Sequence, residues 1–122
     1  MTLISTGAQT PRVLEAAGML DAGGIEATVL HVPTIKPLDL PAIVAAADRT
    51  DRVITVEEHT VLGGLGGAIA ETLSEHRPTR VQRIGLQDTF TESGPNEGML
   101  DLYGLSASRV AEEVVRMLER VT

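Results

Sequence analysis

The sequence predicts an α/β fold, a three-layer α/β/α domain built on a mainly parallel sheet of about four strands. Short β-branched and apolar runs alternate along the chain with segments whose apolar residues recur at helical spacing. Glycine and proline separate many of these segments, as expected at turns and helix ends. Strands that alternate with helices form parallel sheets covered by helices on both faces. We therefore expect one domain that spans residues 1–122.

The first strand is predicted at Thr2–Ser5, and a loop around Gly7 follows it. Thr10 suits the N-cap of the next helix, because its hydroxyl can accept a hydrogen bond from a free backbone N–H group. Pro11 suits the first helical position, where no N–H group is needed. This helix should end at Gly23–Gly24, since glycine adopts the left-handed conformation without steric cost. Its apolar stripe consists of Val13, Leu14, Ala17 and Leu20.

The second strand is predicted at Ala27–Val32, which is rich in β-branched residues. Asp39 can then cap a short helix from about Leu40 to Ala47. The third strand, Arg52–Glu57, contains a continuous apolar and β-branched run that is typical of a strand buried on both faces. After a glycine-rich stretch, a helix is predicted from about Leu65 to His76.

The fourth strand is predicted at Arg80–Leu86, which is less apolar and so should lie nearer an edge of the sheet. A loop is expected at Gln87–Glu97, and Asn96 can cap a short helix that reaches Tyr103. Ser106 should cap the last helix. One face of that helix consists of Val110, Val114, Met117, Leu118 and Val121, and the other should carry an i,i+4 ion pair between Glu112 and Arg116.

We expect the strand order second, first, third, fourth, because right-handed crossovers leave few alternatives. The first and third strands are then neighbours whose helices lie on opposite faces of the sheet. The loop at Gly7 and the loop from Glu57 to Gly67 should meet at this switch point. Ligands of open α/β sheets collect at such a point, beyond the carboxyl ends of the strands.

Composition excludes several classes of function. The chain has no cysteine, which excludes disulfides and thiolate chemistry or thiolate metal ligands. A net charge of −7 argues against a general binder of nucleic acids or anionic membranes. No apolar run approaches the roughly 18 residues of a membrane-spanning helix, so a cytoplasmic protein is expected. The first strand follows Met1 at once, which suggests a longer chain that was cut or a subunit that was split.

The polar residues after the third strand are candidates for chemistry. Glu57, Glu58 and His59 could serve as general acid and base or bind a metal ion. However, adjacent residues of an extended segment point to opposite sides, so we do not expect all three to converge. A role in packing or at an interface is the favoured interpretation.

Four glycines occupy five positions just beyond these residues, namely Gly63, Gly64, Gly66 and Gly67. Backbone N–H groups at such a helix start could hold a phosphate. The spacing does not match the dinucleotide motif G-x-G-x-x-G, because Ile69 stands where a third glycine is needed, and no P-loop lysine follows. The favoured interpretation is that small residues let the helix lie close to the sheet or to another subunit.

Six short stretches, in this order, resemble the C-terminal domain of the transketolases. They are Leu3–Gly7, Pro33–Asp39, Val53–His59, Gly63–Gly66, Phe90–Gly94 and Tyr103–Ser106. The family extends to 1-deoxyxylulose-5-phosphate synthase and the 2-oxoacid dehydrogenases. The resemblance implies a three-layer α/β/α domain of an enzyme that uses thiamin diphosphate and Mg²⁺. It further implies transfer of a two-carbon ketol unit between sugar phosphates.

In that family two other domains hold the cofactor, while the C-terminal domain mainly builds the dimer and borders the approach to the active site. The resemblance therefore implies no catalytic, cofactor-binding or metal-binding residue in this chain, which should be inactive alone. Its expected partners are the N-terminal and central thiamin-diphosphate-binding domains or subunit, and a homo-oligomer is expected. The family's sheet usually has a fifth, antiparallel edge strand before the position of Leu3. The given sequence begins too late to contain that strand, so the second strand is expected to be an uncovered edge.

Two alternatives stay open. The chain could be the equivalent domain of a 2-oxoacid dehydrogenase or oxidoreductase, or of 1-deoxyxylulose-5-phosphate synthase. In a different class, it could be a free-standing anion-binding or regulatory module that uses the glycine-rich helix start.

Overall fold

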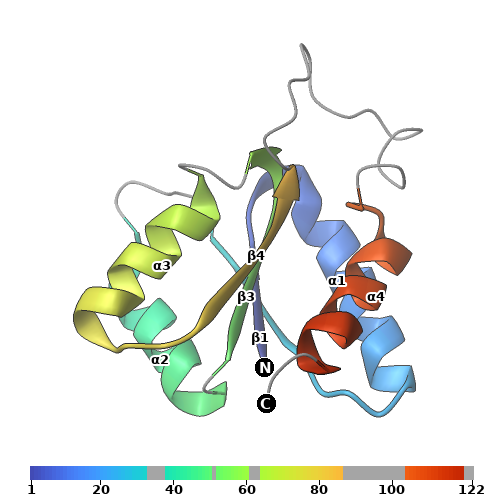
Figure 1. The fold of residues 1–122 in the computed structure, drawn as a ribbon, viewed down its shortest axis with the longest axis horizontal. Coiled ribbons are helices and arrows are strands. Elements are labelled where there is room, and N and C mark those ends of the chain that lie inside the picture. The colour runs from blue at the N-terminus through green and yellow to red at the C-terminus, as the bar shows by residue number, and fades with distance from the viewer. Residues whose placement is uncertain (33–37, 51, 61–63, 87–103, 120–122) are drawn as a thin grey trace.

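The computed structural model describes residues 1–32, 38–50, 52–60, 64–86 and 104–119. Four parallel strands form one sheet in the order β2-β1-β3-β4, which confirms the predicted order. The strands are β1 (Thr2–Ser5), β2 (Thr28–His31), β3 (Val53–Thr60) and β4 (Val81–Leu86). One face is covered by α1 (Thr10–Ala22) and α4 (Ala107–Glu119), the other by α2 (Leu40–Thr50) and α3 (Leu65–His76) (Figure 1). The predicted three-layer α/β/α fold is therefore confirmed.

The inner strands β1 and β3 separate two hydrophobic cores. Leu3 of β1 and Ile54 of β3 are register partners, and both lie in the core under α1 and α4. Ile4 and Val53 lie in the core under α2 and α3. Successive residues of a strand point to opposite faces, so a strand covered on both sides needs an unbroken apolar run. This requirement explains the continuous run that the sequence shows in β3.

Three predicted helix ends are confirmed. Gly24, with φ of 85°, takes the left-handed conformation just after α1. The carboxylate of Asp39, just before α2, accepts a hydrogen bond from the N–H group of Ala42 in the first turn of the helix, at 3.2 Å. The hydroxyl of Ser106 accepts one from the N–H group of Arg109 at 3.4 Å at the start of α4. These caps supply acceptors that the first helical turn lacks.

The prediction that Thr10 caps α1 is wrong. A 3₁₀ turn, η1 (Gly7–Gln9), leads directly into α1, and the N–H group of Thr10 donates to the carbonyl of Gly7. Thr10 is therefore already helical. Its hydroxyl lies 2.7 Å from Nδ1 of His31 instead, so it joins the start of α1 to the end of β2.

Two predictions are also wrong, one for the apolar stripe of α1 and one for the charged face of α4. Leu14 is 56% exposed, and Ala16 takes its expected place in the core, because α1 turns Val13, Ala16 and Leu20 inward. On α4, Arg116 pairs with Glu113 and Arg109 with Glu112, so the ion pairs span i,i+3 rather than the predicted i,i+4.

Other predictions lie outside the described residues. They concern the connection that contains Pro33 and Pro37, the loop at Gln87–Glu97, the short helix that ends at Tyr103, and Val121.

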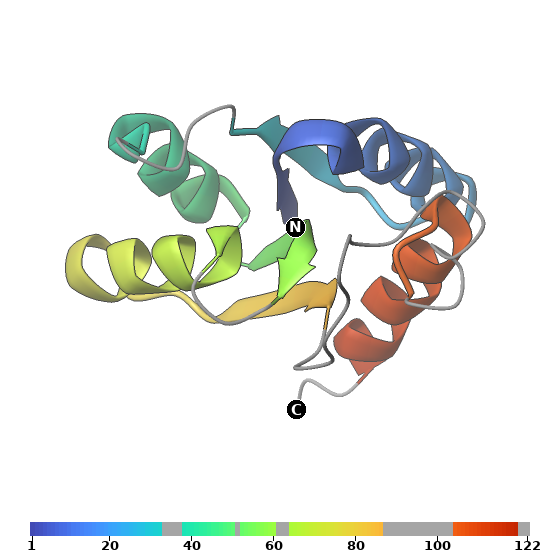
Figure 2. The ribbon, with the colours of Figure 1, turned by 90° about the horizontal axis from the view of Figure 1, so that it is seen from above.

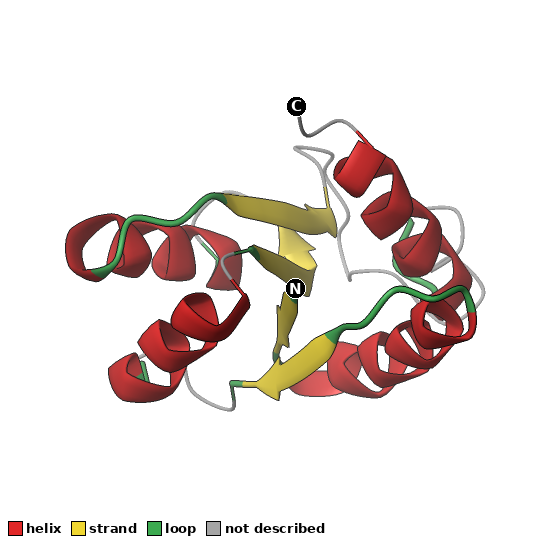
Figure 3. Cartoon of the chain, turned by 90° about the horizontal axis from the view of Figure 1, so that it is seen from below, coloured by secondary structure: helices red, strands yellow, loops and turns green. Residues whose placement is uncertain are grey.

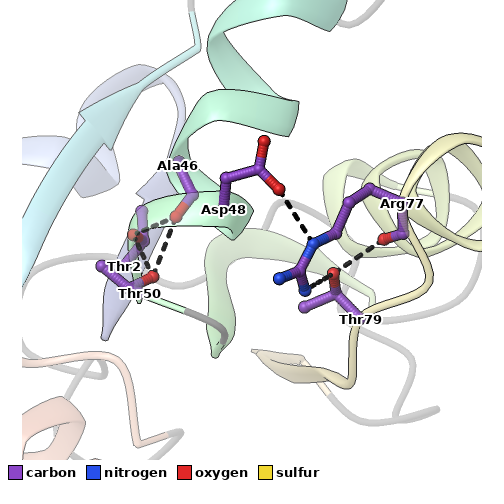
Figure 4. Close-up of polar contacts among 6 residues, drawn as sticks. All are labelled: Thr2, Ala46, Asp48, Thr50, Arg77 and Thr79. Atoms are coloured by element: carbon purple, nitrogen blue, oxygen red, sulfur yellow. Dashed lines mark hydrogen bonds and ion pairs between the residues drawn. The ribbon is translucent and has the colours of Figure 1, made fainter.

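Polar contacts join α2 to its neighbours at the amino end of the sheet (Figure 4). The hydroxyls of Thr2 and Thr50 lie 2.8 Å apart, and that of Thr50 donates to the carbonyl of Ala46 at 3.0 Å. Beside them, Nε of Arg77 donates to Asp48 at 3.0 Å. These contacts tie α2 to β1 and to the end of α3, at the end of the sheet opposite the predicted switch point.

Candidate functional site

The predicted switch point lies at the carboxyl ends of β1 and β3, which Figure 2 shows from above. Ser5, the last residue of β1, is the register partner of Val56 in β3. The turn η1, which contains Gly7, contacts β3. The structure therefore places the start of α1 beside the third strand, while residues 61–63 of the predicted loop lie outside the described part.

Glu57 lies within β3, at the position where the strand was predicted to end, and it is fully buried. Its side chain contacts the start of α3. One carboxylate oxygen accepts a hydrogen bond from the N–H group of Leu65 at 2.8 Å, and the other accepts one from Gly66 at 2.6 Å. These are the first two residues of α3, whose N–H groups have no partner within the helix. The negative charge also lies at the positive end of the helix dipole.

The position of Glu57 counts against one interpretation of the glycine-rich stretch, a phosphate site. A phosphate held at this helix start would need the same backbone N–H groups that the carboxylate already occupies. Both oxygens of Glu57 are engaged and buried, so this side chain is a structural anion rather than an exposed acid or base. The start of α3 is satisfied from within the chain.

Gly66 allows α3 to approach the sheet closely. A Cβ atom at this position would lie 2.7 Å from Oγ1 of Thr55 and 2.7 Å from Cδ of Arg83. At Gly67, one residue later, a Cβ atom would meet nothing within 4 Å. The prediction that glycine serves close packing is therefore confirmed at Gly66, whereas Gly67 faces open space.

These features are consistent with a family match over most of the chain. Residues 1–110 match the model of the transketolase C-terminal domain. The chain belongs to this family. The resemblance seen in the sequence is thereby confirmed.

Members of the transketolase family are similar over nearly the whole chain. An uncharacterised transketolase family protein of Sinorhizobium fredii is 47% identical over 120 residues, which are 96% of this chain and 35% of that protein. A 6-deoxy-6-sulfo-D-fructose transketolase subunit of a Clostridium species is 39% identical over 122 residues, which are 100% of this chain and 37% of that subunit. The chain thus spans about a third of the length of these relatives.

Similar proteins also include a solved structure and a second class of enzyme. A split-gene transketolase, described as an inactive beta4 tetramer, superposes with a TM-score of 0.85 at 44% identity, over 94% of this chain and 38% of that one. A 1-deoxy-D-xylulose-5-phosphate synthase of Heliobacterium modesticaldum is 41% identical over 112 residues, which are 91% of this chain and 17% of that enzyme.

The other candidate residues of this transketolase-family chain are only partly described. Gly7 is exposed and has a positive φ of 60°, so glycine is required there by backbone conformation. Gly64 is the N-cap of α3, and its carbonyl accepts a hydrogen bond from the N–H group of Ala68 at 3.1 Å. The backbones of Glu58 and His59 continue β3, which extends beyond its predicted end, but their side chains and all of Gly63 lie outside the described part.

The described residues lack two kinds of feature. Within residues 1–32, 38–50, 52–60, 64–86 and 104–119, no three His, Asp or Glu side chains are grouped so that they could hold a metal ion. Among those same residues, every helix is too short or too polar to span a bilayer.

One buried contact near the site was missed by the sequence analysis. Gln9 is fully buried, and its Nε2 donates to the carbonyl of Leu105 at 2.8 Å, while its Oε1 accepts from Arg12 at 2.7 Å. This contact joins the start of α1 to the segment just before α4. No local pattern reveals it, because Gln9 and Leu105 are 96 residues apart in sequence.

Proposed function

We propose that this chain is the C-terminal assembly domain, or a split subunit, of a transketolase-like enzyme that transfers a two-carbon ketol unit between sugar phosphates. The observation that carries the proposal is the match to a split-gene transketolase at a TM-score of 0.85 and 44% identity. Support also comes from the sulfofructose transketolase subunit, of which this chain covers 37%. The missing length corresponds to partner domains or a partner subunit.

In this proposal the complete enzyme uses thiamin diphosphate and Mg²⁺, which supply the carbanion chemistry of ketol transfer and are held by the partner. The described residues of this chain do not fit that cofactor. They contain no cluster of acidic or histidine ligands, and the start of α3, which could have held a diphosphate, is filled by Glu57. This chain then contributes no catalytic residue, and its activity depends on the partner.

The proposed role of the switch point is contact with other parts of the enzyme. The segment comprises Gly7, Glu57–His59, Gly63, Gly64, Gly66 and Gly67. Within it, the hydrogen bonds that Glu57 accepts from α3 hold the helix start in place without using any group outside the chain. A rigid carboxyl edge would suit a surface that borders an active site formed by other domains. Homo-oligomerisation and a cytoplasmic location belong to the same proposal.

The test combines binding and reconstitution. Calorimetric titration of the isolated chain with thiamin diphosphate and Mg²⁺ should give no saturable heat. Ketol transfer from a ketose phosphate to an aldose phosphate should require co-expression with a subunit that carries the other two domains. Micromolar cofactor binding by the isolated chain, or turnover without the partner, would contradict the proposal.

A second candidate within the family is the C-terminal domain of a 1-deoxyxylulose-5-phosphate synthase. The 41% identity to such an enzyme favours it, although this chain covers only 17% of that protein. The reconstituted enzyme distinguishes the two candidates by its donor. Consumption of pyruvate with release of CO₂ would support the synthase, whereas consumption of a ketose phosphate would support the transketolase.

The anion-binding module is the alternative from a different class. It would require saturable binding of inorganic phosphate or a nucleotide by the isolated chain. The two N–H groups occupied by Glu57 count against such binding at α3.

A further inference from the structure

The strands β3 and β4 begin side by side at the amino end of the sheet, which Figure 3 shows from below. Arg52 and Arg80 directly precede them, each within the pattern R-x-x-R-V. The two valines, Val53 and Val81, are register partners, so one step earlier Arg52 comes opposite Arg80. The carbonyl of Arg52 accepts a hydrogen bond from the N–H group of Thr2 at 2.9 Å, so this arginine continues the ladder between β1 and β3. Two positive side chains therefore start adjacent strands, whose backbones are about 4.8 Å apart.

These two arginines lack a counter-charge in the part of the chain that the structure describes. Neither guanidinium group forms an ion pair or a hydrogen bond there. Arg77, three residues before Arg80, is different, because it donates to Asp48 at 3.0 Å (Figure 4). The whole chain has 17 acidic and 10 basic residues, so carboxylates are not scarce. Like charges on directly opposite residues destabilise a sheet, and an anion between them would remove that repulsion.

Two buried side-chain atoms beside this pair also lack a partner, namely Nη1 of Arg52 and Oε1 of Gln82. Gln82 is the register partner of Ile54, which lies in the core under α1 and α4. Alternate residues of a strand share a face, so Arg52 and Gln82 lie on that same face, at diagonal positions of adjacent strands. Arginine does not lose its charge, and a buried N–H group without an acceptor is costly. An unfilled donor and an unfilled acceptor are thus neighbours.

We propose that Arg52, Arg80 and Gln82 bind a small oxyanion that carries a proton, of the class of inorganic phosphate. Its charged oxygens accept hydrogen bonds from the two guanidinium groups, whose forked geometry matches phosphate. Its hydroxyl group donates to Oε1 of Gln82, which a fully ionised anion cannot do. One ligand then offsets the repulsion between the arginines and fills both buried polar atoms. The site stands whether or not the proposed transketolase role holds.

The required proton separates free phosphate from related anions. Inorganic phosphate keeps at least one proton at neutral pH. Sulfate has none, and a phosphate monoester loses its last proton near pH 6, at about the second ionisation of phosphoserine. We therefore expect the free ion to be preferred over the phosphate group of a larger molecule. The site also differs from the anion-binding module, which would use the start of α3 at the other end of the sheet.

The first experiment titrates the chain with inorganic phosphate at pH 7.5 and constant ionic strength, over roughly 0.1–20 mM. Sodium sulfate and glycerol 3-phosphate are the matched probes. Arginine Nε–H signals in ¹H–¹⁵N spectra report binding at the guanidinium groups themselves. We expect a dissociation constant near the millimolar range for phosphate, since few contacts hold a small ion. The other two anions should bind about tenfold more weakly, because both leave Oε1 of Gln82 unfilled.

The second experiment removes the guanidinium groups one at a time. Arg52→Gln and Arg80→Gln should each weaken phosphate binding about tenfold or more, because each removes a charged donor. The control is Arg49→Gln, which makes the same change of charge at an exposed arginine in the last turn of α2. It should change the affinity less than about twofold, since salt screens exposed charges that do not contact the ligand.

The third experiment removes the acceptor. Gln82→Met has a side chain of similar length but no carboxamide. It should lower the affinity for phosphate to that for sulfate, and it should leave the affinity for sulfate nearly unchanged. A role of Gln82 in stability alone would lower both affinities equally or neither.

The same titrations in the complex co-expressed with the partner subunit test whether a protein carboxylate takes the place of the ion. Phosphate should bind there as it does to the chain alone. Binding that is lost in the complex would assign the arginines to an acidic side chain of the partner and overturn the inference.

Three further outcomes would overturn it. The first is the absence of saturable shifts with phosphate. The second is an equal loss of affinity in Arg49→Gln and Arg80→Gln, which would reduce binding to the general field of the surface. The third is equal affinity for phosphate and sulfate, which would contradict the donor bond to Gln82. Should Arg52→Gln fail to fold, Arg80→Gln still tests the pair, because Arg80 is exposed.

Discussion

The helices α1 and α3 both begin at the carboxyl end of the sheet, yet their first turns are built differently. At α3 the buried carboxylate of Glu57, in the preceding strand, accepts hydrogen bonds from two backbone N–H groups. Gly66 lets the helix lie close to Thr55. At α1 a 3₁₀ turn starts at the exposed Gly7, and no side chain caps the helix. A glycine after a strand therefore has two separate causes in this molecule: close approach at Gly66 and a left-handed backbone at Gly7.

Replacing the buried carboxylate should have the largest effect. Glu57→Gln keeps the size of the side chain, but its amide NH₂ group would face an N–H donor of α3, and the charge at the helix start is lost. Two hydrogen bonds to a charged acceptor are affected, so we expect a loss of about 2–4 kcal/mol in the free energy of unfolding. Urea denaturation followed by circular dichroism measures it.

The matched control is Asp39→Asn, which alters an exposed cap with one N–H contact at 3.2 Å. Asparagine also caps helices well, so this change should cost less than about 0.5 kcal/mol. If both variants lost the same free energy of unfolding, burial of Glu57 would not strengthen its contact with α3.

The next largest effect is expected at Gly66. Gly66→Ala places a Cβ atom 2.7 Å from Oγ1 of Thr55 and from Cδ of Arg83. The exposed arginine can move, but the buried threonine can yield only by shifting, so we expect a loss of about 1–3 kcal/mol. Gly66→Val should cost more. Thermal unfolding should show a fall of about 3–5 °C for each kcal/mol in a chain of this size.

Gly67→Ala is the control within the same helical turn. Its Cβ atom meets nothing within 4 Å, and alanine favours the helix over glycine, so stability should rise by about 0.5–1 kcal/mol. In a Thr55→Ala background the obstructing oxygen is absent, and Gly66→Ala should cost less than in the unmodified chain. A loss that stays the same in both backgrounds would refute close packing against Thr55.

Much of the fold could be predicted because local patterns and connection rules agree. The continuous apolar run of β3 and the β-branched residues of β2 each indicated a strand. Glycine and Ser106 indicated helix ends. The right-handed crossover rule then left few strand orders, among them the one that the structure has. The first and last residues of α3 were predicted without error, since Gly64 and Pro78 bound the helical spacing.

The site was predicted only in its location. Sequence placed Glu57 at the switch point but could not show that its carboxylate points to the N–H groups of Leu65 and Gly66, eight and nine residues later. It also could not separate Gly66 from Gly67, because that difference depends on Thr55 and Arg83 in the neighbouring strands. The error at Thr10 has the same origin, since its hydroxyl contacts His31 of β2 rather than its own helix.

The smallest effect is expected at Gly7, where conformation rather than space requires glycine. A Cβ atom there would meet nothing within 4 Å, but the residue has φ of 60°, a conformation that costs other residues roughly 1–2 kcal/mol. Alanine also restricts the unfolded chain, which offsets part of this cost, so Gly7→Ala should lose about 1 kcal/mol. Gly7→Asn should lose less, because asparagine tolerates the left-handed conformation. Urea denaturation of the two variants measures the difference. A Gly7→Ala loss as large as that of Gly66→Ala, with no recovery in Gly7→Asn, would show that the two glycines do not differ in the way proposed.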